Sequence, residues 1–203
     1  MCGIVAYSGL RPALPVLIGG LKRLEYRGYD SSGIAVETPD HIAIRKSKGK
    51  VANLVSLVDS EPSLSDSTCG IAHTRWATHG PPTTENAHPH AGGRNDIALV
   101  HNGIIENHRA LRAKLTADGY TFLSETDTEV LAHLVDSLYD GNLLEAVTAA
   151  LKQIEGTFGI ACMAHAEPGT LVVARRGSPI VLGMGENGTI VASDASAIIK
   201  HTR

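Results

Sequence analysis

MCGIVAYSG (residues 1–9) begins the chain with a cysteine directly behind the initiator methionine and continues as a short apolar run. The run is typical of a buried strand. Removal of Met1 would leave Cys2 with a thiol and a free α-amine, whose unperturbed pKa is about 7.7–8.0. That amine could act as the base for the thiol, which is one route to a covalent acyl-enzyme. The alternative is a cysteine selected for packing, and Cys2 by itself leaves both interpretations open.

The composition limits the class of protein. The 203 residues are 43% hydrophobic, which suits one or at most two globular domains. A formal net charge of -3 provides no general attraction for nucleic acid or for an anionic membrane. No apolar run approaches the roughly 20 residues of a membrane-spanning helix. We therefore expect a cytoplasmic protein with neither a nucleic acid nor a membrane as partner.

Three cysteines and a group of histidines raise the question of a disulfide or a metal site. Cys69 and Cys162 lie in apolar, strand-like stretches and are interpreted as small buried hydrophobes without disulfide bonds. A zinc site could be imagined from Cys69, His73, His79, His88 and His90. Their spacing matches no familiar zinc pattern, so no metal is expected, and no other cofactor is predicted.

Strand-like stretches occupy both ends of the chain, and most of the helical stretches lie between them. The patterns predict strands at 2–9, 32–37, 41–47, 69–77, 97–105, 157–165, 170–176, 180–185 and 189–194. They predict helices at 11–28, 51–58, 106–119, 127–141 and 142–156, and a helix or its exit at 196–203. This order lacks the strand–helix alternation of a parallel doubly wound sheet. We expect an α+β fold in which two antiparallel sheets are flanked by helices.

The segment 78–96 is predicted to be a long polar loop, and a loop of this length in a compact domain is more often functional than idle. Arg75, Trp76, Thr78 and His79 lie at its start. The planar fork of an arginine matches a carboxylate, so this cluster would suit a small ligand that carries one. A strand-edge arginine beside a core tryptophan explains the same residues equally well.

Two further positions have both a chemical and a structural interpretation. Asn102 and Gly103 offer a side-chain amide and an unobstructed backbone N–H, which are suitable donors to an oxyanion, although Asn-Gly is also a common turn dipeptide. Asp127 lies at the start of a predicted helix, where capping explains it. Its carboxylate could also bind an ammonium group.

Six ordered motifs make the chain recognisable. They are CGIV (2–5), LEYRGYDSSG (24–33), HTRWATHG (73–80), NAHPH (86–90), HNGIIEN (101–107) and SETDTEV (124–130). In this order they resemble the class II, or N-terminal nucleophile, glutamine amidotransferase domains. Within that family the chain is most similar to the glutaminase domains of the glucosamine-6-phosphate synthases. The resemblance implies a four-layer αββα sandwich, which agrees with the layers expected from the patterns.

The resemblance also implies roles for individual residues. Cys2 would attack the side-chain amide of L-glutamine, with its own α-amine as base, to give a γ-glutamyl thioester and ammonia. Asn102 and Gly103 would form the oxyanion hole. Arg75 would bind the α-carboxylate of the substrate and Asp127 its α-ammonium group.

Further residues are implied in supporting roles. Trp76, Thr78 and His79 would line or close the substrate pocket. Arg27 would support the N-terminal strand and the cysteine, and His88 would have a nearby stabilising role.

The resemblance covers residues 2–203. Complete synthases of this kind also carry sugar isomerase domains that bind fructose 6-phosphate and receive the ammonia, and nothing in this chain resembles them. We therefore expect a C-terminally truncated glutaminase domain whose partners are L-glutamine and those isomerase domains. A homodimer of the full-length enzyme stays open. The alternatives are the glutaminase domain of another class II amidotransferase and a catalytically silent glutamine-binding module.

Overall fold

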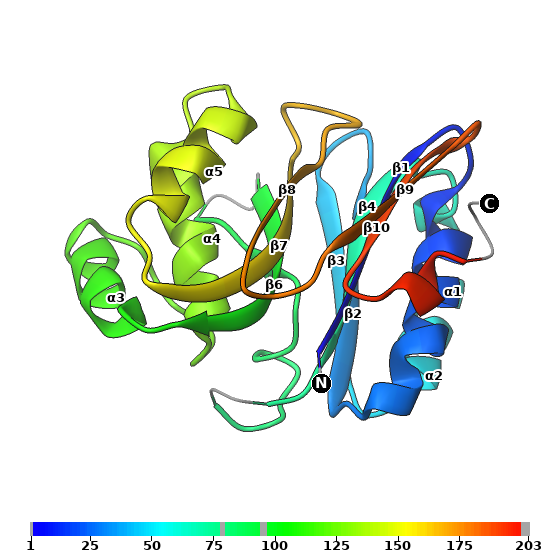
Figure 1. Ribbon diagram of the computed structural model, residues 1–203, viewed down its shortest axis with the longest axis horizontal. Coiled ribbons are helices and arrows are strands. Elements are labelled where there is room, and N and C mark those ends of the chain that lie inside the picture. Colours follow the sequence, from blue (N-terminus) through cyan, green and yellow to red (C-terminus); the bar gives the residue numbers. More distant parts are fainter. Residues whose placement is uncertain (1, 78–79, 94–96, 200–203) are drawn as a thin grey trace.

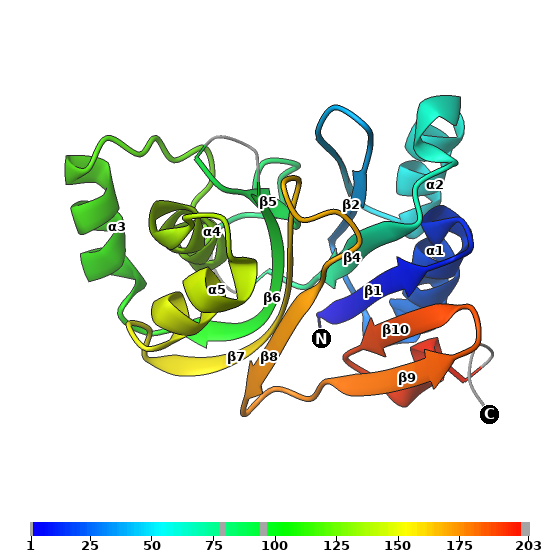
Figure 2. The same ribbon diagram turned by 90° about the horizontal axis from the view of Figure 1, so that it is seen from above.

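The computed structural model describes residues 2–77, 80–93 and 97–199. Within these residues two β-sheets lie face to face, and helices cover the outer face of each sheet (Figure 1 and Figure 2). The four layers confirm the predicted αββα sandwich. The start of the first strand lies beside the space between the two sheets and is close to both of them (Figure 1 and Figure 2).

The larger sheet has the strand order β3-β2-β4-β1-β10-β9, and each neighbouring pair is antiparallel. Its strands are β1 (Gly3–Gly9), β2 (Ser31–Glu37), β3 (Ile42–Lys48), β4 (Cys69–Arg75), β9 (Val181–Gly185) and β10 (Gly188–Ala192). β1 lies in the interior of the sheet, between β4 and β10. The register pairs Gly3 with Thr74 and Ile4 with His73, which brings the residue before β1 to the end of β4.

The smaller sheet has the order β5-β6-β7-β8 and is also antiparallel. Its strands are β5 (His90–Ala91), β6 (Ile97–Ile105), β7 (Gly156–Ala164) and β8 (Val172–Arg176). β5 lies inside the segment predicted to be a loop, so that prediction was wrong at these two residues. Its pairing with β6 is the reason, since His90 faces Leu99 across the ladder and a two-residue strand has no pattern of its own.

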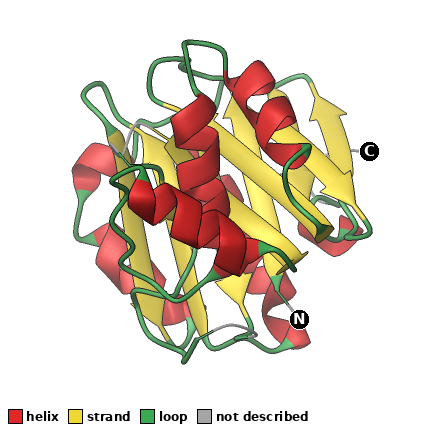
Figure 3. Cartoon of the chain, turned by 90° about the vertical axis from the view of Figure 1, so that its left-hand side faces the viewer, coloured by secondary structure: helices red, strands yellow, loops and turns green. Residues whose placement is uncertain are grey.

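Helices cover the outer faces. α1 (Ala13–Leu24) and α2 (Val51–Asp59) pack on the larger sheet, whereas α3 (His108–Ala117), α4 (Asp127–Leu138) and α5 (Leu143–Leu151) lie on the side of the smaller one (Figure 3). Short 3-10 turns occupy Glu25–Arg27, Pro62–Leu64 and Ala195–Ala197. The last of these replaces the start of the helix predicted at 196–203. Among the described residues no helix has the length and apolar character needed to cross a membrane.

Strand alternation decides which side chains face the space between the sheets. In β4 the residues Cys69 and Ile71 belong to the inner core, whereas Ala72 faces the helices. In β6 the inner positions are Ala98 and Val100, and Leu99 faces the helices. Continuing each strand by steps of two directs His73 and Arg75 of β4, and Asn102 of β6, toward the opposite sheet. Cys2 extends the inner series of Ile4 and Ala6 in the same way.

The two other cysteines are fully buried, as expected. Cys69 lies in the core between the sheets and Cys162 in the core beneath α4 and α5. Both are free thiols. Burial raises the pKa of the Cys69 thiol to about 12 and also raises the pKa of Cys162 above its ordinary value. Neither thiol is therefore ionised near neutral pH, which suits packing and not reactivity.

Candidate active site

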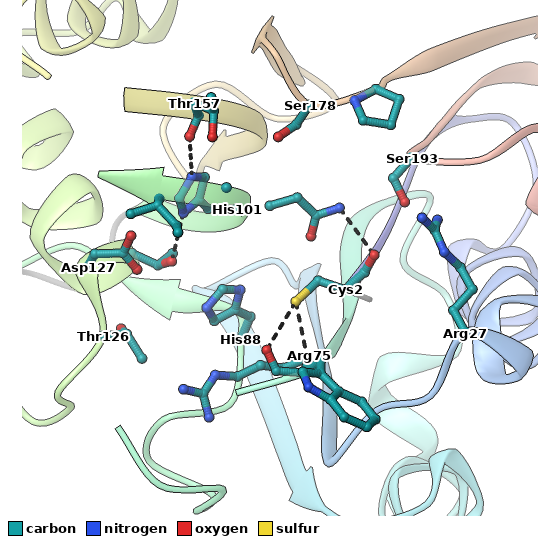
Figure 4. Close-up of a pocket in the computed structure, with 16 residues that line it drawn as sticks. Cys2, Arg27, Arg75, His88, His101, Thr126, Asp127, Thr157, Ser178 and Ser193 are labelled. Atoms are coloured by element: carbon teal, nitrogen blue, oxygen red, sulfur yellow. Dashed lines mark hydrogen bonds between the residues drawn. The ribbon is translucent and has the colours of Figure 1, made fainter. Parts of the chain in front are cut away.

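A cavity of about 470 Å³ opens at the end of the sandwich where Cys2 lies (Figure 4). All the predicted site residues that the structure describes line it: Cys2, Arg27, Arg75, Trp76, His88, Asn102, Gly103 and Asp127. Thr78 and His79, which were also predicted, lie outside the described residues. A cavity of this volume is within the range of small-molecule sites.

Cys2 is held by the backbone of the residue that follows β4. Its Sγ accepts a hydrogen bond from the Trp76 N–H at 3.2 Å and lies 3.5 Å from the Trp76 carbonyl oxygen. Burial raises the pKa of the Cys2 thiol, and the Trp76 N–H and the Arg75 charge oppose that rise. Because the net effect is a raised pKa, the thiol is mostly protonated near neutral pH and needs a base before it can act as a nucleophile.

Asn102 and Gly103 lie inside β6 and not in a turn, so the turn interpretation was wrong. Gly103 pairs with Phe158 of β7, and its φ of 139° is in the region that favours glycine. A Cβ at this position would lie 2.1 Å from the Thr157 carbonyl oxygen, so no other residue fits without a shift of the backbone. The Asn102 Nδ2 lies 3.5 Å from the Cys2 carbonyl oxygen. The pair therefore places a side-chain amide and a glycine backbone at the wall of the cavity that Cys2 also lines.

Arg75 is buried, with 3% of its surface exposed. Its guanidinium donates to the carbonyl oxygens of Gly80 and Pro81, both at 3.3 Å, and lies 4.0 Å from the Asp30 carboxylate. Asp30 in turn accepts a hydrogen bond from the Ala77 N–H at 2.5 Å. These contacts fix the fork of Arg75 at the wall of the cavity, where it could meet a carboxylate.

Asp127 is the first residue of α4, and 5% of its surface is exposed. Its Oδ2 accepts a hydrogen bond from the Ile105 N–H at 2.8 Å, at the end of β6. The cap of α4 is Thr126, whose side chain accepts from the Glu129 N–H at 3.2 Å. Asp127 is therefore not the cap of this helix, and the interpretation of Asp127 as a capping residue was wrong. Its carboxylate is held at the cavity wall, where it could meet a cation.

Arg75 and Asp127 lie on the same side of Cys2, and Arg27 lies on the other (Figure 4). Arg27 is 3.6 Å from the Asp194 carboxylate, which connects the turn after α1 to the segment after β10. Trp76 is 53% exposed and is not the core tryptophan of the alternative interpretation. Its ring packs over Gly28, where an added Cβ would lie 2.7 Å from the Cζ3 atom. Both contacts bring the end of α1 close to the cavity.

Three buried histidines lie beside the cavity. The His73 and His88 rings are 4.2 Å apart between centroids, and those of His88 and His90 are 5.0 Å apart. Burial lowers the pKa of His73 to about 3 and the pKa values of His88 and His90 well below 6.5. These rings stay neutral near pH 7 and are poor proton acceptors. In the described part of the chain, no group of three or more His, Cys, Asp or Glu residues could hold a metal ion.

Several cavity residues were not found from the sequence: His101, Ile104, Thr126, Thr128, Thr157, Ser178, Pro179 and Ser193. His101, Ile104, Thr126 and Thr128 are neighbours of predicted residues inside the HNGIIEN and SETDTEV motifs, so the motifs themselves carried a signal. The other four come from β7 and from the segments after β8 and β10. No local pattern could place them here, because only the folding of the chain brings them together.

Comparisons with known proteins agree with this arrangement. The glutamine amidotransferase domain family matches residues 73–200. The glutamine–fructose-6-phosphate aminotransferases (isomerizing) of Chlorobaculum tepidum and Thermus thermophilus are both 51% identical to the chain over its full length. The chain spans about a third of the length of these curated relatives, 34% and 33% respectively.

Two solved structures have a similar fold over nearly the whole chain. Glutamine phosphoribosylpyrophosphate amidotransferase from B. subtilis is 28% identical, with a TM-score of 0.79 over 98% of this chain and 43% of its own. A structure described as the allosteric regulatory enzyme of purine biosynthesis is also 28% identical, with a TM-score of 0.81 over the same shares. Facing antiparallel sheets between helices, with a cysteine leading the first strand into the cavity, define the N-terminal nucleophile hydrolase fold. The chain belongs to the glutamine amidotransferase domain family.

Proposed function

We propose that this chain hydrolyses the side-chain amide of L-glutamine to glutamate and ammonia. The Cys2 Sγ attacks the amide carbon while the α-amine of Cys2 accepts the thiol proton. The same amine then gives a proton to the departing nitrogen, which leaves as ammonia and a γ-glutamyl thioester. Water adds to the thioester carbon, and glutamate is released with the thiol restored.

The observation that carries this proposal is the shared cavity of Cys2, Asn102, Gly103, Arg75 and Asp127. Asn102 Nδ2 and the Gly103 N–H are the donors for the oxyanion of the tetrahedral intermediate. Arg75 binds the α-carboxylate and Asp127 the α-ammonium group, so a free amino acid is preferred to a glutamine within a peptide. Trp76, Thr78 and His79 cover the substrate, and Arg27 and His88 support the site.

The catalytic cysteine of this proposal works only once Met1 has been removed. With Met1 in place the nitrogen of Cys2 is an amide, which is not a base. A thiol whose pKa is raised by burial then keeps its proton. Retention of Met1 is therefore expected to leave a folded chain with almost no turnover.

We further propose that the ammonia serves the amination of fructose 6-phosphate by sugar isomerase domains of a longer protein. The names of the relatives that are 51% identical support this, since the chain spans a third of their length. In this proposal residues 2–203 are the glutaminase domain of a cytoplasmic enzyme, with a homodimer as a possible assembly. The phosphoribosylpyrophosphate amidotransferase is only 28% identical to the chain, so it gives weaker support for a different acceptor of the ammonia than the 51% identical relatives give for fructose 6-phosphate.

The direct test measures glutamate and ammonia released from L-glutamine by the purified protein, with Cys2→Ser as the matched control. We expect equal amounts of the two products, and almost none from the variant. Absence of turnover in protein shown to begin at Cys2 would favour a silent glutamine-binding module. Formation of glucosamine 6-phosphate from fructose 6-phosphate tests the acceptor separately, and its absence in the full-length protein would favour another class II amidotransferase.

A further inference from the structure

His73 and Asn102 approach each other from opposite sheets. His73 lies on β4 and is fully buried, and Asn102 lies on β6 with its side chain directed at the same inner space. The His73 Nε2 is 2.9 Å from the Asn102 Oδ1 and 3.1 Å from the carbonyl oxygen of His101. One ring nitrogen therefore faces two oxygen atoms of adjacent residues.

The His101 carbonyl settles which protons are present. A carbonyl oxygen only accepts hydrogen bonds, so the His73 Nε2 must carry the hydrogen that lies toward it. A protonated Nε2 cannot accept a bond from an amide NH₂ group. The atom of Asn102 that faces His73 must therefore be its oxygen, and the NH₂ group must point the other way, toward the Cys2 carbonyl oxygen at 3.5 Å.

We propose that His73 is a positioning residue that holds the Asn102 amide with its NH₂ group toward the oxyanion. This inference rests on the proposed function, in which Asn102 donates to the tetrahedral intermediate. A rotated amide would present its own oxygen to the developing negative charge and would repel it. His73 disfavours this rotation. While its Nε2 donates to the His101 carbonyl oxygen it carries a hydrogen, so it cannot accept a hydrogen bond from the NH₂ group of a rotated Asn102.

The surroundings of His73 keep the ring in this state. Its ring packs against His88 at 4.2 Å between centroids. Its Nδ1 is buried and has no hydrogen-bond partner among the described residues, as expected of an unprotonated nitrogen that leaves the hydrogen on Nε2. The low pKa of about 3 keeps the ring neutral across the working range of pH.

The test is a double-mutant cycle between His73 and Asn102 on the full chain, with kcat and KM for L-glutamine as readouts. His73→Phe keeps a ring of similar size but removes the donor. We expect it to lower kcat by about 10- to 100-fold with KM changed by less than about threefold, because the donor acts on the transition state. In the Asn102→Ala background the same change should alter kcat by less than about twofold. His73→Gln, which keeps an N–H donor, should recover part of the lost kcat.

Alkylation of Cys2 by iodoacetamide is the control reaction, because it forms no oxyanion. Its rate should be the same in wild type and in folded His73 variants, and thermal unfolding shows that each variant is folded. Equal losses of kcat from His73→Phe in both backgrounds would overturn the proposal, as would an unchanged kcat in the wild-type background. If His73→Phe does not fold, His73→Leu, which also lacks a hydrogen-bond donor, replaces it in the same cycle with the same expected outcomes. A wild-type protein without glutaminase turnover would instead remove the proposed function, and this inference with it.

Discussion

At the scale of single residues, the site combines a thiol that resists ionisation with three buried histidines, His73, His88 and His90, that stay neutral near pH 7. Burial raises the pKa of Cys2, and it lowers the pKa of His73 to about 3. Of the histidines that the structure describes, His73, His88 and His90 are therefore unsuited to act as the base of a cysteine–histidine pair. In the proposed function the base is the α-amine of Cys2, whose unperturbed pKa is about 7.7–8.0.

Asn102→Ala tests the oxyanion role. If the amide stabilises the tetrahedral intermediate, kcat should fall by roughly 100-fold or more, because removing one such donor costs about this much in other enzymes. KM should change little, since the donor acts on the transition state. Steady-state glutaminase kinetics provide the measurement. A variant with normal kcat would leave Asn102 as a structural residue of β6.

Arg75→Ala tests the carboxylate-binding role. Hydrogen bonds to a charged group contribute about 1.5–3 kcal/mol, so loss of the fork should raise KM for L-glutamine by about 10- to 100-fold. Arg75→Lys is the matched control, and it should recover part of the affinity because it keeps the charge but not the planar fork. An unchanged KM in Arg75→Ala would remove this residue from substrate binding.

At the scale of elements, helix α1 packs closely against β1, the strand that directly follows Cys2. A Cβ on Gly20 would lie 2.8 Å from both methyl carbons of Val5, whereas a Cβ on Gly19 would meet nothing within 4 Å. The two glycines are neighbours in the same helix, so they share its backbone preference. They differ in whether the position faces the sheet.

This contrast predicts opposite effects of one substitution. Gly20→Ala should lower the free energy of unfolding by about 1–3 kcal/mol, because overpacking forces the helix away from β1. Gly19→Ala should raise it by up to about 1 kcal/mol, since alanine is the better residue in a helix interior. Urea denaturation measures both. Equal effects of the two changes would contradict the close packing of α1 on β1.

The elements also show what a sequence can reveal about a site. The sequence predicts strands at 69–77 and 97–105. In the structure Ile71 and Val100 belong to the inner core, and steps of two from them lead to Arg75 and Asn102 on inner faces. The sequence cannot reveal that these two faces oppose each other, since that depends on which strands pair. β5 was missed for the same reason, because a two-residue strand is defined by its partner.

At the scale of the whole molecule, the layered architecture follows from the order of strands and helices, whereas the cavity does not. Thr157 lies in β7, whereas Ser178 and Ser193 reach the cavity from the segments after β8 and β10. Their contribution is set by the closing of the second sheet against the first. Neither the spacing of motifs nor the composition shows how the two sheets approach each other. The motifs therefore predicted the candidate reactive residues but not all the residues that line the cavity.

The neutral histidines between the layers make the stability of the molecule depend on pH. His73, His88 and His90 have folded-state pKa values below the ordinary 6.5, so the unfolded chain binds more protons when the pH falls below that value. Their contribution is complete above pH 6.5 and is lost as the pH falls below that value, down to about 3 for His73. At a pH where the unfolded chain protonates a ring and the folded chain does not, that ring lowers the free energy of unfolding by about 1.4 kcal/mol per pH unit.

Urea denaturation at a series of pH values measures this loss. We expect the free energy of unfolding to fall as the pH is lowered below about 6.5. In His90→Gln the unfolding free energy should fall less steeply with pH, because unfolding then takes up about one proton fewer. A stability that is flat across this range, or a slope unchanged in the variant, would contradict the burial of neutral rings.

The central claim is that Cys2 is a nucleophile only when its own nitrogen is free. The most direct measurement is the intact mass of the protein after brief exposure to 6-diazo-5-oxo-L-norleucine, an electrophilic analogue of glutamine, applied to chains that begin at Met1 and chains that begin at Cys2. We predict one adduct per chain, located on Cys2, in the form that begins at Cys2, and almost none in the form that keeps Met1. Equal labelling of the two forms, or labelling that survives Cys2→Ala, would contradict the claim.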